Sequence, residues 1–158
     1  MEKDTEFMRL AIEQARLAAE DGEVPVGAVV VRNGEVVSTG RNRREKGKNA
    51  LAHAEIEAIN NACAALGGWR LWECDLYVTL EPCPMCAGAI INSRIKKVVY
   101  GAKDEKAGSC GTVTDLFEFP YNHKPLTVRG VLEDECAQLL SDFFKSLRER
   151  KKEKKYNF

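Results

Sequence analysis

Apolar residues recur with helical spacing near both ends of the chain and gather in short valine-rich stretches between them. Residues 6–20 place apolar side chains three or four positions apart, which predicts an amphipathic helix with Asp4 or Thr5 as its N-cap. Residues 133–154 carry a similar apolar stripe and predict a long C-terminal helix. Residues 28–32 and 35–39 flank Asn33-Gly34, so we expect them to form a β-hairpin.

Helices and strands alternate through the rest of the chain. After a polar loop that ends at Asn49, the pattern predicts helices over 52–66, 84–93 and 112–117, and strands over 75–79, 97–101 and 126–131. The hairpin must be antiparallel, whereas the helical crossovers can support parallel neighbours. We therefore expect a single domain over residues 1–158 with a three-layer α/β/α fold, in which a five-stranded mixed sheet has helices on both faces.

Composition is that of a soluble globular protein. Of the 158 residues, 44% are hydrophobic and 30% are charged, so one ordinary domain can bury a core without disulfide bonds. No apolar run approaches the ~20 residues that a membrane helix needs, and the N-terminus lacks the apolar core of an export signal. We expect a cytoplasmic protein that does not enter membranes and whose six cysteines stay reduced.

The charges balance overall but are unevenly placed. The chain has 24 basic and 24 acidic residues, and so lacks the general positive charge typical of nucleic-acid-binding proteins. Basic residues nevertheless gather in two segments, 41–48 and 147–158. The second is the main candidate for contacts with RNA phosphates, although cations near a helix C-terminus are favourable without any ligand.

The most informative residues form two short motifs, His53-Ala54-Glu55 and Pro82-Cys83-Pro84-Met85-Cys86. One imidazole and two thiolates offer three ligands to one zinc ion, and three protein ligands leave the fourth position to water, as in catalytic sites. Both motifs start predicted helices, whose N-terminal dipoles favour thiolates. We expect one zinc ion per subunit, bound by His53, Cys83 and Cys86.

Glu55 lies two residues after His53, where it is poorly placed to share a helical face with it as a further ligand. A carboxylate beside zinc-bound water can take its proton and pass it to a ring nitrogen and a leaving amine, which is general acid–base catalysis. This signature, with a glutamate that is not a ligand, is typical of the zinc deaminases of nucleobases.

Other interpretations of the Cys-x-x-Cys pair remain open. A redox pair normally accompanies a thioredoxin-like unit and needs no His-x-Glu motif. A structural zinc site needs a fourth ligand, which His123 could supply. The remaining cysteines form no second Cys-x-x-Cys, and we expect them to be small buried hydrophobic residues; they are Cys63, Cys74, Cys110 and Cys136.

Further segments extend the pattern over nearly the whole chain. They are GEVPVGAV at 22–29, the Asn42-Arg43 pair, AHAE at 52–55, YVTLEPCPMCAGA at 77–89, GAKD at 101–104, Asn122-His123, and the ending from Glu135-Cys136 to Phe143-Phe144. With these segments the sequence resembles the bacterial tRNA-specific adenosine deaminase (TadA) family of the cytidine deaminase-like superfamily. The resemblance implies conversion of the wobble adenosine of a tRNA anticodon loop to inosine. It also implies a homodimer whose active sites use loops of both subunits.

The resemblance assigns roles to individual residues as well. Asn42 matches a residue that hydrogen-bonds the purine, since a carboxamide can donate and accept along a purine edge, although a turn asparagine is the plainer interpretation. Residues that match the base pocket are Val24, Pro25 and Val26, which could also be core residues, and Ala54 through its backbone N–H. Residues that match positions near bound nucleotides are Asp104, Asn122 and His123.

Two residues of the C-terminal helix are added as RNA contacts. Phe144 and Arg148 are four positions apart and can share one helix face beside the basic run. A solvated helix end is the alternative interpretation of that run. The chain departs most from the family in the loop 44–49 and at its extreme C-terminus, and we expect neither to touch the metal site.

Two other functions remain open. The same zinc ligands serve deaminases of a free nucleobase or nucleoside, such as guanine or cytosine. A function of a different class is a non-catalytic, zinc-stabilised RNA-binding module. Glu55 argues against that module, because a structural zinc site has no use for an acid–base glutamate.

Overall fold

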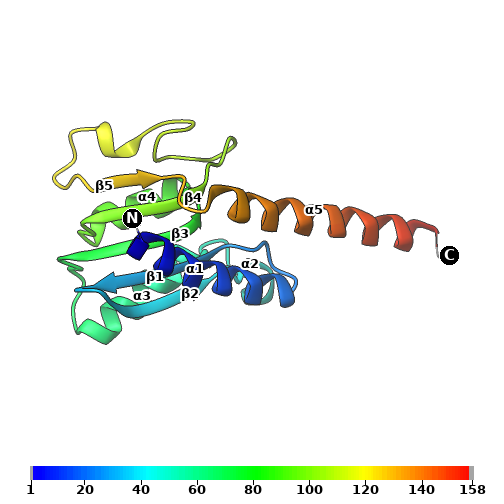
Figure 1. Cartoon of the computed structure of the whole chain (residues 1–158), viewed down its shortest axis with the longest axis horizontal. Coiled ribbons are helices and arrows are strands. Elements are labelled where there is room, and N and C mark those ends of the chain that lie inside the picture. Colours follow the sequence, from blue (N-terminus) through cyan, green and yellow to red (C-terminus); the bar gives the residue numbers. More distant parts are fainter. Residues whose placement is uncertain (1, 157–158) are drawn as a thin grey trace.

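The computed structural model describes residues 2–156 and shows a central sheet with helices packed against it (Figure 1). In chain order the elements are α1 (Glu2–Glu20), β1 (Gly27–Arg32), β2 (Glu35–Arg41), α2 (Arg44–Gly47), α3 (Ala54–Leu66), β3 (Cys74–Leu80), α4 (Pro84–Asn92), β4 (Lys97–Ala102), the 3-10 turn η1 (Leu116–Glu118), β5 (Leu126–Arg129) and α5 (Glu133–Tyr156). Within the described part of the chain, no helix combines the length and the apolar character needed to cross a membrane.

The five strands form one mixed sheet in the order β2-β1-β3-β4-β5. β1 pairs antiparallel with β2 and β3, whereas β3, β4 and β5 run parallel to one another. The hairpin turn has Asn33 at φ 52° and Gly34 at φ 76°, the two left-handed residues that a type I′ turn requires. The fold class predicted from the sequence is confirmed.

Alternate strand residues face two separate apolar clusters, as the two-residue period of a strand requires. On one face, α1 and α5 cover the strand residues Val29, Val31, Tyr77 and Val99. On the other face, α3 and α4 cover Ala28, Val30, Leu76, Val78 and Val98. The helices that begin with the two chemical motifs therefore share one face of the sheet.

Two glycines bring helix backbones directly onto the strands. A Cβ atom on Gly27 in β1 would lie 2.1 Å from the carbonyl oxygen of Ala11 in α1. One on Gly40 in β2 would lie 2.3 Å from the carbonyl oxygen of Ala54 in α3. Both distances are far inside van der Waals contact, so a larger residue would displace the helix. Because Ala54 lies between His53 and Glu55, Gly40 helps to set the position of both.

Several element ends differ from the prediction. α1 begins at Glu2, so Asp4 and Thr5 lie inside its first turn and are not its N-cap. The polar loop before Asn49 contains the short helix α2. Strands β1 to β4 are longer by one or two residues than predicted, because pairing with their neighbours extends past the apolar stretch.

The predicted helix over 112–117 is wrong. Only the single turn Leu116–Glu118 forms there. The chain before it is folded around the carboxylate of Glu81, which accepts hydrogen bonds from the N–H groups of Cys110 and Thr112. The N–H of Leu116, which a helix over 112–117 would direct to the carbonyl oxygen of Thr112, donates instead to that of Ser109 at 2.9 Å, so the helix does not form.

The carboxyl ends of the parallel strands lie at one edge of the sheet. The segment after β3 leads through residues 81–83 into α4, and the segment after β4 runs from residue 103 toward η1. α5 follows β5 and starts at the same edge, because β5 is parallel to β4. Figure 1 shows the rest of α5 projecting away from the sheet.

Candidate active site

Three side chains from two helix starts form what we call the metal cluster: His53, Cys83 and Cys86. His53 is the N-cap of α3 and Cys83 is the N-cap of α4, and neither side chain is used for capping. Cys86 adds its thiol from the first turn of α4. The Sγ atoms of Cys83 and Cys86 each lie 3.6 Å from Nδ1 of His53.

The spacing within the metal cluster fits a tetrahedral zinc ion. Zinc–sulfur bonds of ~2.3 Å and zinc–nitrogen bonds of ~2.0–2.1 Å at tetrahedral angles place nitrogen and sulfur about 3.6 Å apart. All three ligand atoms lie within 4.8 Å of one another, and no fourth His, Cys, Asp or Glu between residues 2 and 156 joins them. His123 is not a ligand here, because its Nε2 lies 2.7 Å from the carbonyl oxygen of Ile95.

The pKa values of the three groups in the metal cluster are shifted in different directions. The hydrogen bond from Cys86, followed by the one from His53, lowers the pKa of Cys83 to about 4. The same hydrogen bond to Cys83, followed by burial, raises the pKa of Cys86. The pKa of His53 is raised, first by its hydrogen bond with Cys83. One thiolate is thus already present at neutral pH, and a bound cation would displace the remaining protons.

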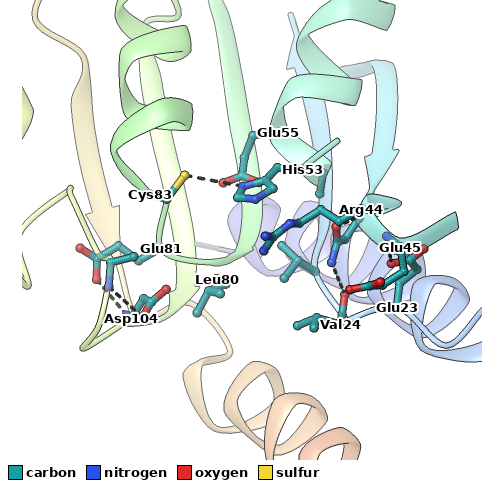
Figure 2. A pocket seen from close by; sticks show the side chains of 14 residues that line it. Glu23, Val24, Arg44, Glu45, His53, Glu55, Leu80, Glu81, Cys83 and Asp104 are labelled. Carbon is teal, nitrogen blue, oxygen red and sulfur yellow. Dashed lines mark hydrogen bonds between the residues drawn. The ribbon is translucent and has the colours of Figure 1, made fainter. Parts of the chain in front are cut away.

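Glu55 lies in the first turn of α3, with its side chain beside the metal cluster (Figure 2). Its side chain is buried, with 3% of the residue exposed. This burial raises the pKa of the carboxyl group to about 7. A carboxyl group that titrates near neutral pH can both take up a proton and return it.

His53, Cys83 and Glu55 line a cavity of about 230 Å³. This volume is below the ~300–1,000 Å³ of sites for drug-sized ligands, and it suits a single base better than a whole nucleotide. Other residues that the sequence singled out and that line this cavity are Val24, Val26, Asn42, Ala54 and Asp104. Pro25 is buried and does not line the cavity.

Hydrogen bonds made by the side chain of Asn42 and by its two neighbours hold this residue in place. Its Nδ2 donates to the carbonyl oxygen of Val24, and its Oδ1 accepts from the N–H of Arg44, both at 3.2 Å. Glu57 in α3 accepts hydrogen bonds from the residues on either side of Asn42, each at 2.6 Å. The amide group of Asn42 keeps one further donor and one further acceptor position for a ligand.

The loop 44–49, which we expected not to touch the metal site, lines the cavity beside it. Arg44 and Glu45 line the cavity, and Figure 2 shows Arg44 extending toward His53. The carboxylate of Glu23, only 1% exposed, accepts hydrogen bonds from the N–H groups of Glu45 at 3.0 Å and Lys46 at 2.8 Å. This buried carboxylate holds the loop at the mouth of the cavity.

Asn122 and His123 lie at the other end of the sheet from the metal cluster. Both precede β5, and His123 contacts Ile95 just before β4, so they lie at the amino ends of the parallel strands. The metal cluster follows the carboxyl end of β3. The structure therefore does not bring these two residues to the cavity of their own chain.

Phe144 and Arg148 lie on α5, outside the cavity. Phe144 is 41% exposed, and Arg148 is exposed as well. The predicted basic run continues along α5 to Tyr156, and residues 157 and 158 of that run lie outside the described residues.

Two acidic residues of the cavity wall, Glu23 and Glu81, were not predicted from the sequence. Each is only 1% exposed. The signal in the sequence was an acidic residue inside an otherwise apolar motif, directly before Val24 in one case and two positions before Cys83 in the other. A buried carboxylate in such a position must be hydrogen-bonded, and it therefore marks an organised loop.

The other cysteines follow the prediction with one exception. Cys74, Cys110 and Cys136 are buried, and burial raises the pKa of the Cys136 thiol to about 12. Cys63 in α3 is only partly buried, although it packs against the apolar cluster on that face of the sheet, so the prediction of a buried residue is wrong for it.

Comparisons with known proteins agree with this geometry. The family model of the MafB19-like deaminases matches residues 2–148. A tRNA-specific adenosine deaminase of Bacillus subtilis (strain 168) is 51% identical over 158 residues, which cover 99% of this chain and 98% of the relative. A solved structure from studies of A-to-I editing by tRNA:A34 deaminases at the wobble position of transfer RNA has a TM-score of 0.84 and 47% identity, and the match covers 86% of this chain and 99% of that one. A guanine deaminase from Nitrosomonas europaea has a TM-score of 0.73 and 28% identity, with 88% and 83% covered.

Proposed function

Because the chain belongs to the tRNA-specific adenosine deaminase family, we propose that it converts the wobble adenosine of a tRNA anticodon loop to inosine. The reaction replaces the amino group on C6 of adenine by oxygen from water and releases ammonia. The observation that supports this chemistry most is the position of Glu55. It is a buried carboxyl group with a pKa of about 7, beside the metal cluster, in a cavity of the size of one base.

We further propose that the metal is zinc, with one ion per subunit held by His53, Cys83 and Cys86. The donor set of one imidazole and two thiols suits zinc, and the 3.6 Å nitrogen–sulfur distances match its tetrahedral geometry. When bound there, zinc supplies a water molecule whose pKa is lowered to ~7, so that hydroxide is available as the nucleophile.

Glu55 moves the protons of the reaction. Its carboxylate first accepts a proton from the attacking water and donates it to the ring nitrogen next to C6. Oxygen then adds to C6, and the carbon becomes tetrahedral. The new hydroxyl on C6 then gives its proton through Glu55 to the amino group, which leaves as ammonia while C6 becomes the carbonyl carbon of inosine. Burial, which raises the pKa of this carboxyl group in the metal-free protein, favours the return of the proton in both steps.

The walls of the cavity position the base. An unpaired loop base leaves its stack at low cost and can enter a pocket. Asn42 uses its remaining donor and acceptor on the purine edge, the apolar side chains of Val24 and Val26 contact the ring, and the N–H of Ala54 orients the base. Pro25 supports this wall from behind. These contacts are proposed from the positions of the residues on the cavity wall.

The RNA around the base meets residues outside the cavity. We propose that Asp104 contacts a neighbouring nucleotide, and that Phe144 and Arg148 on α5 stack on and pair with the anticodon stem-loop. Asn122 and His123 lie too far from their own cavity for this role. They serve the partner's site in a homodimer, whose mass in sedimentation would be twice that of the chain.

A second candidate function is deamination of free guanine. It is favoured by the structural similarity to a guanine deaminase and by a cavity that suits one base. The RNA substrate is supported by the higher identity to the tRNA-specific adenosine deaminase over nearly the whole of both chains.

One experiment separates the two functions. Purified protein is incubated with total tRNA, and the tRNA is sequenced for adenosine-to-inosine changes, while parallel samples measure ammonia release from guanine. The proposal requires inosine at position 34 of at least one tRNA. Ammonia release from guanine without any inosine in tRNA would refute it.

A further inference from the structure

Glu81 places a buried carboxylate between the metal cluster and the segment after β4. Glu81 is 1% exposed and lies two positions before Cys83. No cation among residues 2–154 forms an ion pair with it, and its partners are backbone and hydroxyl groups. A buried charge without a counter-ion is costly unless every acceptor position is used, so its partners define what it does.

Each of the two carboxylate oxygens of Glu81 accepts two hydrogen bonds, and all four come from one loop, residues 103–112. Oε1 accepts from the N–H of Asp104 at 3.1 Å and from the hydroxyl of Thr112. Oε2 accepts from the N–H groups of Cys110 and Thr112, both at 3.1 Å. We call this segment the Glu81 loop. Its two ends are thus held by one side chain, which directly follows β3 on the way to the metal cluster.

The Glu81 loop forms a wall of the cavity opposite Arg44. Figure 2 shows Glu81 and Asp104 together on one side of the pocket, with Arg44 and Glu23 on the other. Oδ1 of Asp104 accepts from the N–H groups of Lys106 and Ala107, which closes a tight turn at the cavity. The other carboxylate oxygen of Asp104 is left for a ligand.

We propose that Glu81 is a positioning residue for the RNA substrate, which fixes the wall formed by Asp104 and Ala107 without touching the reacting base. The proposal rests on the proposed function, because it assumes that this wall contacts RNA. It assigns Glu81 to substrate binding and leaves the proton transfers to Glu55.

The packing at Gly108 supports this role. A Cβ atom there would lie 2.6 Å from Oε1 of Glu81 and 2.4 Å from the carbonyl oxygen of Asp104. The loop therefore closes directly over the carboxylate, and there is no room for a side chain between them. A substitution at Gly108 disturbs the same contact from the loop side, with no change of any ionisable group.

Glutamine cannot replace Glu81 without loss. In one amide orientation its NH₂ group faces the N–H of Asp104, and in the other it faces the N–H groups of Cys110 and Thr112. Two donors then oppose each other in a buried place, and at least one N–H loses its acceptor. Glu81→Gln keeps the size of the side chain, so its effect reports the hydrogen bonds.

The test measures steady-state deamination of a synthetic anticodon stem-loop by zinc-loaded wild type and Glu81→Gln. We expect KM to rise by about tenfold, the effect of losing one hydrogen bond to a charged group, while kcat changes by less than about threefold. Zinc content by atomic absorption should stay stoichiometric. In the Glu55→Ala background, which binds RNA without turnover, Glu81→Gln should weaken the Kd by the same factor.

Two further variants make the test specific. Gly108→Ala should raise KM as Glu81→Gln does, and the double variant should be no worse than the stronger single one, because both disturb one contact. Glu118→Gln is the matched control, since Glu118 is an exposed glutamate that accepts from Lys124 at 3.3 Å, and it should leave KM unchanged.

The inference is overturned if Glu81→Gln leaves KM and Kd unchanged, or if it lowers kcat or zinc content with KM unchanged. The latter result would assign Glu81 to the metal cluster. If Glu81→Gln does not fold, Gly108→Ala decides by the same criteria. Wild-type protein that makes no inosine in the stem-loop refutes the proposed function instead, so the two failures are distinct.

Discussion

Nδ1 of His53 lies 3.6 Å from Sγ of Cys83, although the two residues are 30 positions apart and begin different helices. The contact exists because α3 and α4 lie on the same face of the sheet and start at the same edge. Gly40 contributes by letting the first turn of α3 rest directly on β2. Two helix starts thus meet at one metal cluster.

Removal of the metal should destabilise the fold as well as stop the reaction. A ligand bound at about a thousand times its Kd stabilises the native state by ~4 kcal/mol. For a chain of this length each kcal/mol shifts Tm by ~2–4 °C, so chelation should lower Tm by about 10 °C. Scanning calorimetry before and after chelation, and after zinc is restored, measures this.

The control for metal removal is Cys63→Ser, because Cys63 is outside the metal cluster and partly exposed. This variant should bind zinc and keep the wild-type Tm, whereas Cys83→Ala should purify without metal. An unchanged Tm and full activity after complete chelation would count against a metal at this cluster.

Cysteine reactivity should single out Cys83 in metal-free protein. Its pKa of about 4 lies below neutral pH, so this thiol is ionised and nucleophilic, and it is only partly buried. Burial raises the pKa of Cys63 and Cys74, which keeps both as thiols. Iodoacetamide at neutral pH followed by peptide mass spectrometry should find Cys83 alkylated first, and zinc should protect it. Equal labelling of Cys63 would show that this charge distribution is wrong.

Gly40→Ala should destabilise the protein strongly. The added Cβ would lie 2.3 Å from the carbonyl oxygen of Ala54, and the backbone of α3 would have to move. Overpacking of this kind costs about 3 kcal/mol. Urea unfolding measures the loss, and Gly68→Ala serves as the control because a Cβ added at Gly68 would meet no atom within 4 Å. Equal stability of the two variants would contradict the close contact between β2 and α3.

The sheet and the metal cluster were predictable because local patterns specify them. Asn33-Gly34 fixes the hairpin by its left-handed turn, and the apolar periods of the long helices define their buried faces. Cys83 and Cys86 were recognisable as candidate metal ligands from the two-residue gap between them, and His53 from the His-x-Glu motif at the start of a predicted helix. These features need no knowledge of distant contacts.

Features that depend on long-range hydrogen bonds were not predictable in the same way. The helix expected over 112–117 is absent because the N–H of Leu116, which a helix would direct to the carbonyl oxygen of Thr112, donates to that of Ser109. Glu81, which lies 29 residues before Cys110, holds the start of this segment through the N–H groups of Cys110 and Thr112. Arg44 reaches the cavity because Glu23 binds the loop that carries it. Neither pairing leaves a periodic pattern in the sequence, since each depends on where a loop crosses the sheet edge.

Phe144 and Arg148 should affect RNA binding and not chemistry. Both are exposed on α5, which starts at the edge of the sheet where the parallel strands end. Arg148→Ala should raise KM for the stem-loop by roughly threefold to tenfold and lower the salt dependence of log Kd by about one unit, as expected for one phosphate contact. Phe144→Ala should raise KM with little change in the salt dependence.

The matched control is Arg32→Ala, because Arg32 is an exposed cation at the end of β1, at the opposite edge of the sheet. Fluorescence anisotropy of labelled stem-loop at several salt concentrations provides the comparison. If Arg32→Ala and Arg148→Ala have the same small effect, α5 is a solvated helix end.

Glu55, beside the metal cluster, is the group on which the proposed deamination mechanism depends most, because it moves the protons. The direct measurement is single-turnover inosine formation in an anticodon stem-loop by wild type and Glu55→Gln, with zinc content determined in the same samples. We predict that Glu55→Gln keeps stoichiometric zinc and binds the RNA, and that its rate falls by about 10²–10⁴-fold. A Glu55→Gln protein that forms inosine at the wild-type rate would contradict the mechanism.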